Sequence, residues 1–135
     1  MRKYKIVIGI DEAGRGPLAG PVCVGAVLAK GKRQVLRGIK DSKKLSAKKR
    51  EKWNEILRKH FECHFTLVSN KIIDKAGINK AVFLGVKRVL KKFSKRPNLV
   101  LMDGSLKAPK NYYQETIIKG DEKVPLISAA SIIAK

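Results

Sequence analysis

The chain has 135 residues, and 44% of them are apolar, which is enough for the core of one domain and too many for a disordered segment. Its 31 lysines and arginines outnumber its 11 acidic residues, so the formal net charge is +20 at pH 7. This charge favours an acidic polyelectrolyte as partner, nucleic acid ahead of an anionic membrane, and no apolar run is long enough to span a bilayer.

The first half of the chain begins with an apolar run rich in β-branched residues, which is typical of a buried strand. A short glycine-rich turn links it to a second strand, and such a short link favours antiparallel pairing. Ser46, or the pair Asp41-Ser42, can cap the helix that follows a basic loop. The pattern predicts strands at residues 4–10 and 22–29, a helix up to His60, and a strand at 61–69.

The second half predicts a helix at 79–93, strands at 98–102 and 113–118, and a helix at 125–135. The order is β-β-α-β-α-β-β-α, which indicates an α/β domain over residues 1–135 with one five-stranded mixed sheet flanked by helices. The last helix is apolar nearly all round. We therefore expect its outer face to lack a cover within this chain, and we interpret the chain as part of a longer domain.

Acidic residues are scarce, and four of them follow predicted strands: Asp11, Glu12, Asp103 and Asp121. Ligand sites in open α/β sheets lie at such strand ends. Four carboxylates that meet there need a counter-charge, and oxygen ligands favour Mg²⁺ or Mn²⁺ over zinc. Two such ions could clamp a phosphodiester during hydrolysis. The alternative is that each acid only caps a helix or lies in a turn.

The turn at residues 14–17 (GRGP) also has two interpretations. It can be an ordinary hairpin connection, since glycine and proline are common turn residues. It can also be a site where backbone groups approach a sugar-phosphate and Arg15 binds a phosphate. The spacing fits neither a Walker loop nor a dinucleotide-binding fingerprint.

The motifs together resemble type 2 ribonuclease H, and bacterial ribonuclease HII matches best. The resemblance covers about residue 5 to the end. It rests on residues 9–21 (GIDEAGRGPLAGP), 41–45 (DSKKL), Ile73-Asp74 with Asn79 and Ala81, 101–104 (LMDG), 119–121 (KGD) and 129–135 (AASIIAK).

The resemblance implies a ribonuclease H-like fold and assigns the metal-binding, catalytic carboxylates to Asp11, Glu12, Asp103 and Asp121. It places the turn that senses the 2′-hydroxyl of a ribonucleotide on Gly14, Arg15 and Gly16. It makes Ser42, Lys43 and Lys44 contacts to the substrate backbone, although each lysine could equally belong to a solvated helix entrance.

The implied activity is endonucleolytic hydrolysis of the RNA strand of RNA–DNA hybrids, and cutting on the 5′ side of ribonucleotides embedded in duplex DNA. It would use two Mg²⁺ or Mn²⁺ ions and leave 5′-phosphate ends, in removal of ribonucleotides and RNA primers. The family pattern continues beyond Lys135 with an Arg-Asp pair, further helices and a substrate-packing tyrosine, which this sequence lacks.

Several other interpretations of these residues remain open. A non-catalytic nucleic-acid-binding protein fits the charge equally well, because phosphate contacts dominate non-specific affinity. His60, Cys63 and His64 could suggest a soft-metal site but lack a fourth ligand. Tyr112 and Tyr113 could stack on a base or simply pack. With no signal-peptide pattern and two cysteines that lack metal spacing, we expect reduced thiols in a cytoplasmic monomer.

Overall fold

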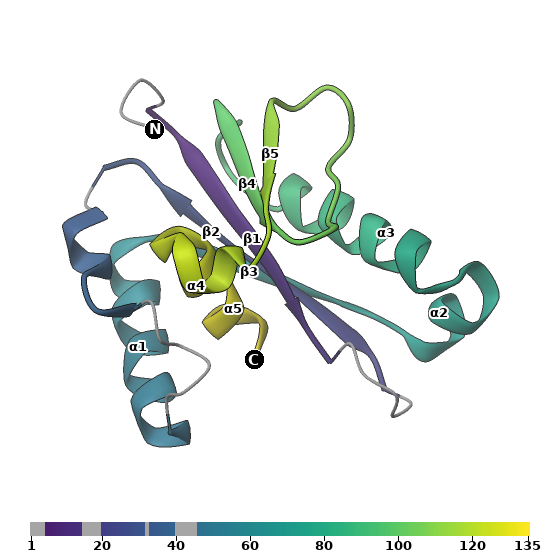
Figure 1. The fold of residues 1–135 in the computed structure, drawn as a ribbon, viewed down its shortest axis with the longest axis horizontal. Helices are drawn as coiled ribbons and strands as arrows, with labels where there is room; N and C mark the ends of the chain where they lie inside the picture. Colours follow the sequence, from purple (N-terminus) through teal and green to yellow (C-terminus); the bar gives the residue numbers. More distant parts are fainter. Residues whose placement is uncertain (1–4, 15–19, 32, 40–45) are drawn as a thin grey trace.

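The computed structural model describes residues 5–14, 20–31, 33–39 and 46–135 (Figure 1). Its centre is a mixed five-stranded sheet of order β3-β2-β1-β4-β5. β1 pairs antiparallel with β2 and parallel with β4, so the predicted hairpin and mixed sheet are confirmed. The strands are β1 (Val7–Ala13), β2 (Val22–Ala29), β3 (Glu62–Val68), β4 (Leu99–Asp103) and β5 (Gln114–Ile117).

The helices include three short elements that the sequence pattern did not predict: η1, α2 and α4. Each of them is too short to display a full apolar period. Ser46 caps α1 by accepting a hydrogen bond from the backbone N–H of Lys49, as expected. The helical elements are η1 (Arg33–Leu36), α1 (Ala47–His60), α2 (Asn70–Ala76), α3 (Ile78–Lys91), α4 (Gly120–Lys123) and α5 (Pro125–Ala134).

Helices cover both faces of the sheet. α2 and α3 lie on one side, and α1, α4 and α5 lie on the other (Figure 1). Alternate residues of the central strands supply the two cores: Ile8 and Ile10 pack with α3, whereas Val7 packs with α5. The result is a three-layer α/β domain in which β1 is the middle strand of the sheet, between β2 and β4.

The expectation that α5 exposes an outer face is wrong. Every residue from Leu126 to Ala134 is buried. α5 lies against β1 and β2, and α1 and η1 pack on it as well, with Leu36 and Leu57 in the same core. An almost wholly apolar helix is thus explained by burial on several sides rather than by a missing cover.

Two glycines bring α5 into contact with the sheet. A Cβ atom at Gly9 would lie 2.7 Å from the carbonyl oxygen of Leu126, and one at Gly25 would lie 2.6 Å from the carbonyl oxygen of Ala130. Any side chain at these positions would displace the backbone of α5. Because α4 directly precedes α5, these glycines also fix where α4 sits relative to β1 and β4.

Cys23 and Cys63 are both free thiols and half-buried, as predicted. Burial raises the pKa of the Cys63 thiol to about 11, which keeps it protonated and unreactive near neutral pH. Among the described residues, no helix combines the length and the apolarity needed to cross a membrane.

Candidate metal centre

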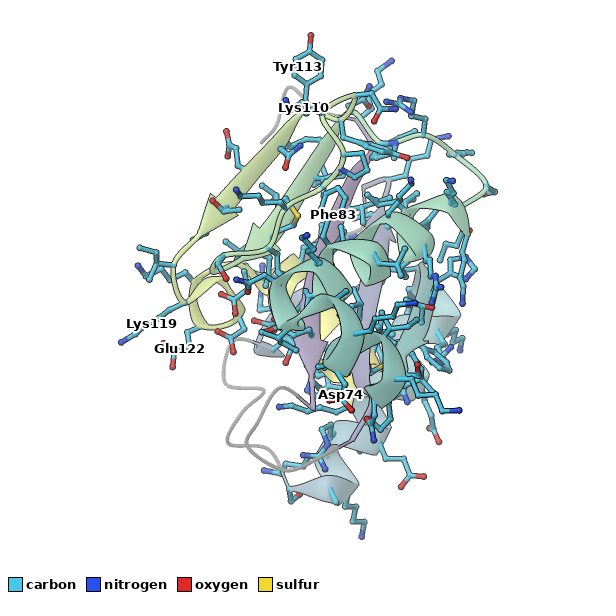
Figure 2. All side chains as sticks on the ribbon, turned by 90° about the vertical axis from the view of Figure 1, so that its right-hand side faces the viewer. Asp74, Phe83, Lys110, Tyr113, Lys119 and Glu122 are labelled. Atoms are coloured by element: carbon cyan, nitrogen blue, oxygen red, sulfur yellow. The ribbon has the colours of Figure 1, made fainter. Side chains whose placement is uncertain are left out.

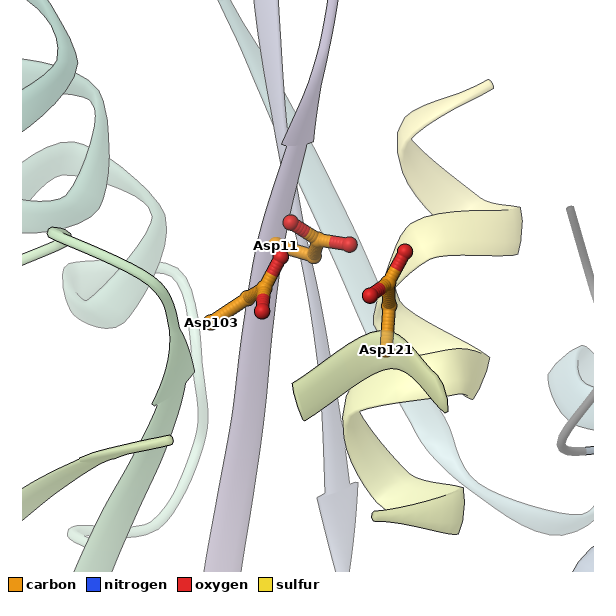
Figure 3. Close-up of side chains that lie close together, drawn as sticks. All are labelled: Asp11, Asp103 and Asp121. Carbon is orange, nitrogen blue, oxygen red and sulfur yellow. The ribbon is translucent and has the colours of Figure 1, made fainter. Parts of the chain in front are cut away.

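Three of the four predicted carboxylates converge at one edge of the sheet. Each of Asp11, Asp103 and Asp121 offers a carboxylate oxygen, and the three oxygens lie within 4.8 Å of one another (Figure 3). Asp11 and Asp121 are 4% and 2% exposed, so two of the three charges are withdrawn from bulk water. In the described part of the chain, this is the one group of three or more acidic, histidine or cysteine side chains with such spacing.

The parallel pairing of β1 and β4 accounts for the first two side chains. Ile10 is the register partner of Met102, so Asp11 and Asp103 leave neighbouring strands at the same end. Val7 and Leu99 start the same alternate rows and pack in the α5-side core, which places residues 11 and 103 on that face too. Two acids far apart in sequence are therefore brought together by strand register alone.

Asp121 reaches the cluster from the short helix α4, not from the end of β5. Lys119 adopts a left-handed backbone conformation (φ 56°), which turns the chain from β5 into α4. The backbone N–H of Gly120 then donates to Asp103 Oδ1 at 2.6 Å. This hydrogen bond ties the start of α4 to the end of β4, and so sets the distance between two of the three carboxylates.

A buried serine that the sequence pattern did not indicate contacts the backbone of Asp121. The Ser128 hydroxyl donates to the backbone carbonyl of Asp121, and Ser128 is fully buried in α5. A hydroxyl inside an otherwise apolar helix is the signal that could have revealed this role, because a buried polar group needs a partner.

Glu12 is not part of the three-carboxylate cluster. β1 continues to Ala13, three residues beyond the predicted strand end, so Asp11 and Glu12 are consecutive strand residues and alternate between the two faces of the sheet. Its carboxyl nevertheless lies close enough to raise the pKa of Asp11. Its assignment as a fourth metal ligand remains a prediction.

The protonation of Asp11 reflects its surroundings. Burial raises its pKa most, and the nearby Glu12 and Asp103 carboxylates add to the rise, while a hydrogen bond from the Glu12 backbone N–H opposes it. The resulting pKa is about 8, against an ordinary value of 3.8. A bound divalent cation would lower the pKa of Asp11 again, because it favours the charged carboxylate.

The donor set fits a hard divalent cation. Three carboxylate oxygens from three elements can share one ion, and Mg²⁺ and Mn²⁺ are bound by such oxygens. Asp11, Asp103 and Asp121 are the residues that would hold it. The structure gives no support to a soft-metal site at His60, Cys63 and His64, which the sequence already disfavoured, since the His64 ring pairs with Glu62 at 2.8 Å.

Gly14 is the part of the glycine-rich turn that the structure describes. It has φ of +86°, and a Cβ atom there would lie 2.7 Å from the carbonyl oxygen of Pro21, so both conformation and space require glycine. It follows β1 directly and therefore lies close in sequence to Asp11. The predicted contacts Arg15, Gly16, Ser42, Lys43 and Lys44 lie outside the described residues.

A mixed sheet of this order, with carboxylates gathered at the ends of its two central strands, defines a ribonuclease H-like domain. The chain belongs to the ribonuclease HII family, whose sequence model matches residues 8–135. It is 44% identical to ribonuclease HII of Caldicellulosiruptor bescii over 133 residues and 49% identical to that of Fusobacterium nucleatum over 139 residues.

Solved structures agree with this assignment. The ribonuclease H2 of Pyrococcus horikoshii matches with a TM-score of 0.82 and 31% identity, and the RNase HII in the PCNA:RNase HII complex of Archaeoglobus fulgidus matches with 0.81 and 30%. Each comparison covers 96% of this chain and 70% of the solved one. Against the two curated relatives, the alignment covers 98% of this chain but 64% of theirs.

Proposed function

We propose that the chain is a metal-dependent ribonuclease that hydrolyses the RNA strand of RNA–DNA hybrids and cuts on the 5′ side of ribonucleotides embedded in duplex DNA. The observation that carries the proposal is the cluster of Asp11, Asp103 and Asp121, two of them buried, in a chain of net charge +20. Basic surface can hold a phosphate backbone while the acidic cluster holds cations.

The proposed chemistry uses two divalent ions. When bound, such a pair supplies an activated water and stabilises the departing 3′-oxygen. Asp11, Asp103 and Asp121, together with Glu12, would hold these ions. The Gly120 N–H holds Asp103 in place, so the protein contributes positioning and charge rather than a nucleophilic side chain.

Substrate selection is assigned to the turn after β1. Gly14, Arg15 and Gly16 would read the 2′-hydroxyl at an RNA–DNA junction, which is the group that distinguishes RNA from DNA. The close approach of Gly14, three residues after Asp11 in the chain, to the Pro21 carbonyl oxygen supports a role for this glycine near the carboxylates. Ser42, Lys43 and Lys44 would contact the phosphates of the substrate.

The proposed setting is removal of ribonucleotides and RNA primers from DNA by a cytoplasmic monomer. A purely structural nucleic-acid-binding protein explains the charge, but it gives no reason to gather three carboxylates at one edge of the sheet, where they repel both one another and phosphate.

The test uses a labelled DNA duplex with one embedded ribonucleotide, an RNA–DNA hybrid and an all-DNA duplex. With Mg²⁺ or Mn²⁺ we expect cutting 5′ of the ribonucleotide and along the hybrid, and no cutting of all-DNA. EDTA should abolish both activities. Duplex binding without cleavage in either ion, or equal cutting of all-DNA, would contradict the proposal.

A further inference from the structure

A pocket of about 660 Å³ lies at the end of the sheet opposite the carboxylates. It is formed by the segments that precede β1, β4 and β5, and its lining includes Lys5, Arg96, Asn98 and Tyr113. Asp103 is four residues further along β4 than Leu99, so the length of the strand alone separates the two ends by about 13 Å. The pocket is therefore distinct from the metal centre.

The wall of the pocket is built by contacts among its own residues. The Arg96 guanidinium lies 4.3 Å from the centre of the Tyr112 ring and donates a hydrogen bond to the carbonyl oxygen of Asn111. On the other side, Asn98 Oδ1 accepts a hydrogen bond from the Ile6 N–H at 2.9 Å. These contacts hold Arg96 and the ring of Tyr112 in place without a ligand.

Tyr113 is the exposed aromatic group of this site. It is 81% exposed, the highest value among the exposed large hydrophobic side chains of the described residues. Figure 2 shows it standing out from the end of the molecule beside Lys110. Because the ring of the preceding residue, Tyr112, already packs against Arg96, the ring of Tyr113 is the one available to stack on a ligand.

The charge around the pocket is positive. Its lining contains Lys5 and Arg96 and, among the described residues, no carboxylate. Lys95 directly precedes Arg96 in the chain, and a hydrogen bond and the charge of Lys95 lower the pKa of Lys30, which follows β2. The acid nearest to this lining in the sequence is Glu115, two residues after Tyr113, and Glu62 in β3 binds Ser94 and His64.

We propose that this pocket binds an unpaired nucleotide of a single-stranded nucleic acid. The base would stack on Tyr113, and the adjoining phosphates would contact Lys5 and Arg96. An exposed ring beside a lysine and a guanidinium is the combination that single-strand-binding proteins use, and stacking tolerates any base. The site would hold a strand away from the metal centre, and its existence does not depend on the proposed ribonuclease activity.

The test measures binding in EDTA, so that the metal centre takes no part. A fluorescent oligothymidylate of about ten nucleotides is titrated with the full chain, and anisotropy gives the dissociation constant. We expect Tyr113→Ala to raise it about tenfold and Tyr113→Phe to leave it nearly unchanged, because phenylalanine retains the stacking face. Lys5→Gln should weaken binding more than Lys75→Gln, which removes an equal charge from α2.

A second readout locates the contact. An oligonucleotide carrying 5-iodouracil is cross-linked by light, and the adduct is mapped by mass spectrometry; we expect it on the peptide that contains Tyr113. Tyr113 is so exposed that its replacement should not unfold the protein. Unchanged affinity of Tyr113→Ala, with adducts mapping outside residues 96–113, would overturn the proposal.

Discussion

Asp103→Asn is expected to lower turnover on an RNA–DNA hybrid on the order of a thousandfold, because it removes one of the three clustered carboxylate charges that, in the proposed mechanism, would hold the catalytic ions. The amide oxygen of asparagine can still accept the hydrogen bond from Gly120, so α4 should keep its place. Affinity for the duplex should be retained or rise slightly, since one repulsive carboxylate is gone.

The measurement is single-turnover cleavage of the hybrid, with duplex affinity determined separately in EDTA. Glu51→Gln, on the exposed face of α1, is the matched control, because it makes the same carboxylate-to-amide change away from the cluster. Turnover by Asp103→Asn equal to that of Glu51→Gln would remove Asp103 from the mechanism.

Gly25→Ala is expected to lower the free energy of unfolding by about 3 kcal/mol, which is large for the addition of one methyl group. The new Cβ would lie 2.6 Å from both the Ala130 carbonyl oxygen and the Ala134 amide nitrogen. Both are backbone atoms of a buried helix, so no side-chain rotation relieves the clash. α5 would have to move off β2 and open the core that it shares with β1.

The free energy of unfolding is measured by chemical denaturation for Gly25→Ala and for Gly20→Ala. Gly20 has no atom within 4 Å of an added Cβ, so its replacement should change stability by less than about 1 kcal/mol. Equal stability of the two variants would show that the close contact between α5 and the sheet is not rigid in solution.

The sheet could be predicted from the sequence because each strand has a recognisable local pattern of residues. Apolar, β-branched runs bounded by glycine and proline place β1, β2 and β4 to within a few residues. The short link after β1 also identifies the antiparallel pair. Elements of four to seven residues, such as α2 and α4, carry too little periodicity to be separated from turns.

The sequence predicted only part of the arrangement of the carboxylates, because the exact ends of the strands decide which side chains meet. Scarce acids after predicted strands indicated that Asp11 and Asp103 would lie close together, and the structure confirms this proximity, which follows from parallel pairing. The position of Glu12 outside the three-carboxylate cluster depends on whether β1 ends at residue 10 or 13, and an apolar pattern cannot fix a boundary where polar side chains follow. Asp121 reaches the cluster from α4 because Lys119 has a left-handed backbone conformation. Residue preferences do not predict that conformation for a lysine.

The complete burial of α5 required knowledge of tertiary contacts. A run of apolar residues shows that a helix is buried, but it does not show which elements bury it. Only the folded arrangement reveals that glycines at positions 9 and 25 admit α5 to one face of the sheet while η1 and α1 close over it.

Titration of Mn²⁺, followed by loss of the electron paramagnetic resonance signal of the free ion, tests the metal centre most directly. At pH 8 the chain should bind Mn²⁺, and Asp103→Asn should lose that binding while Glu51→Gln keeps it. Binding should weaken from pH 8 to pH 6, because Asp11, with a pKa of about 8, is then mostly protonated and the ion must displace the proton. Equal binding by the chain and Asp103→Asn at pH 8 would contradict the assignment of these carboxylates to a metal site.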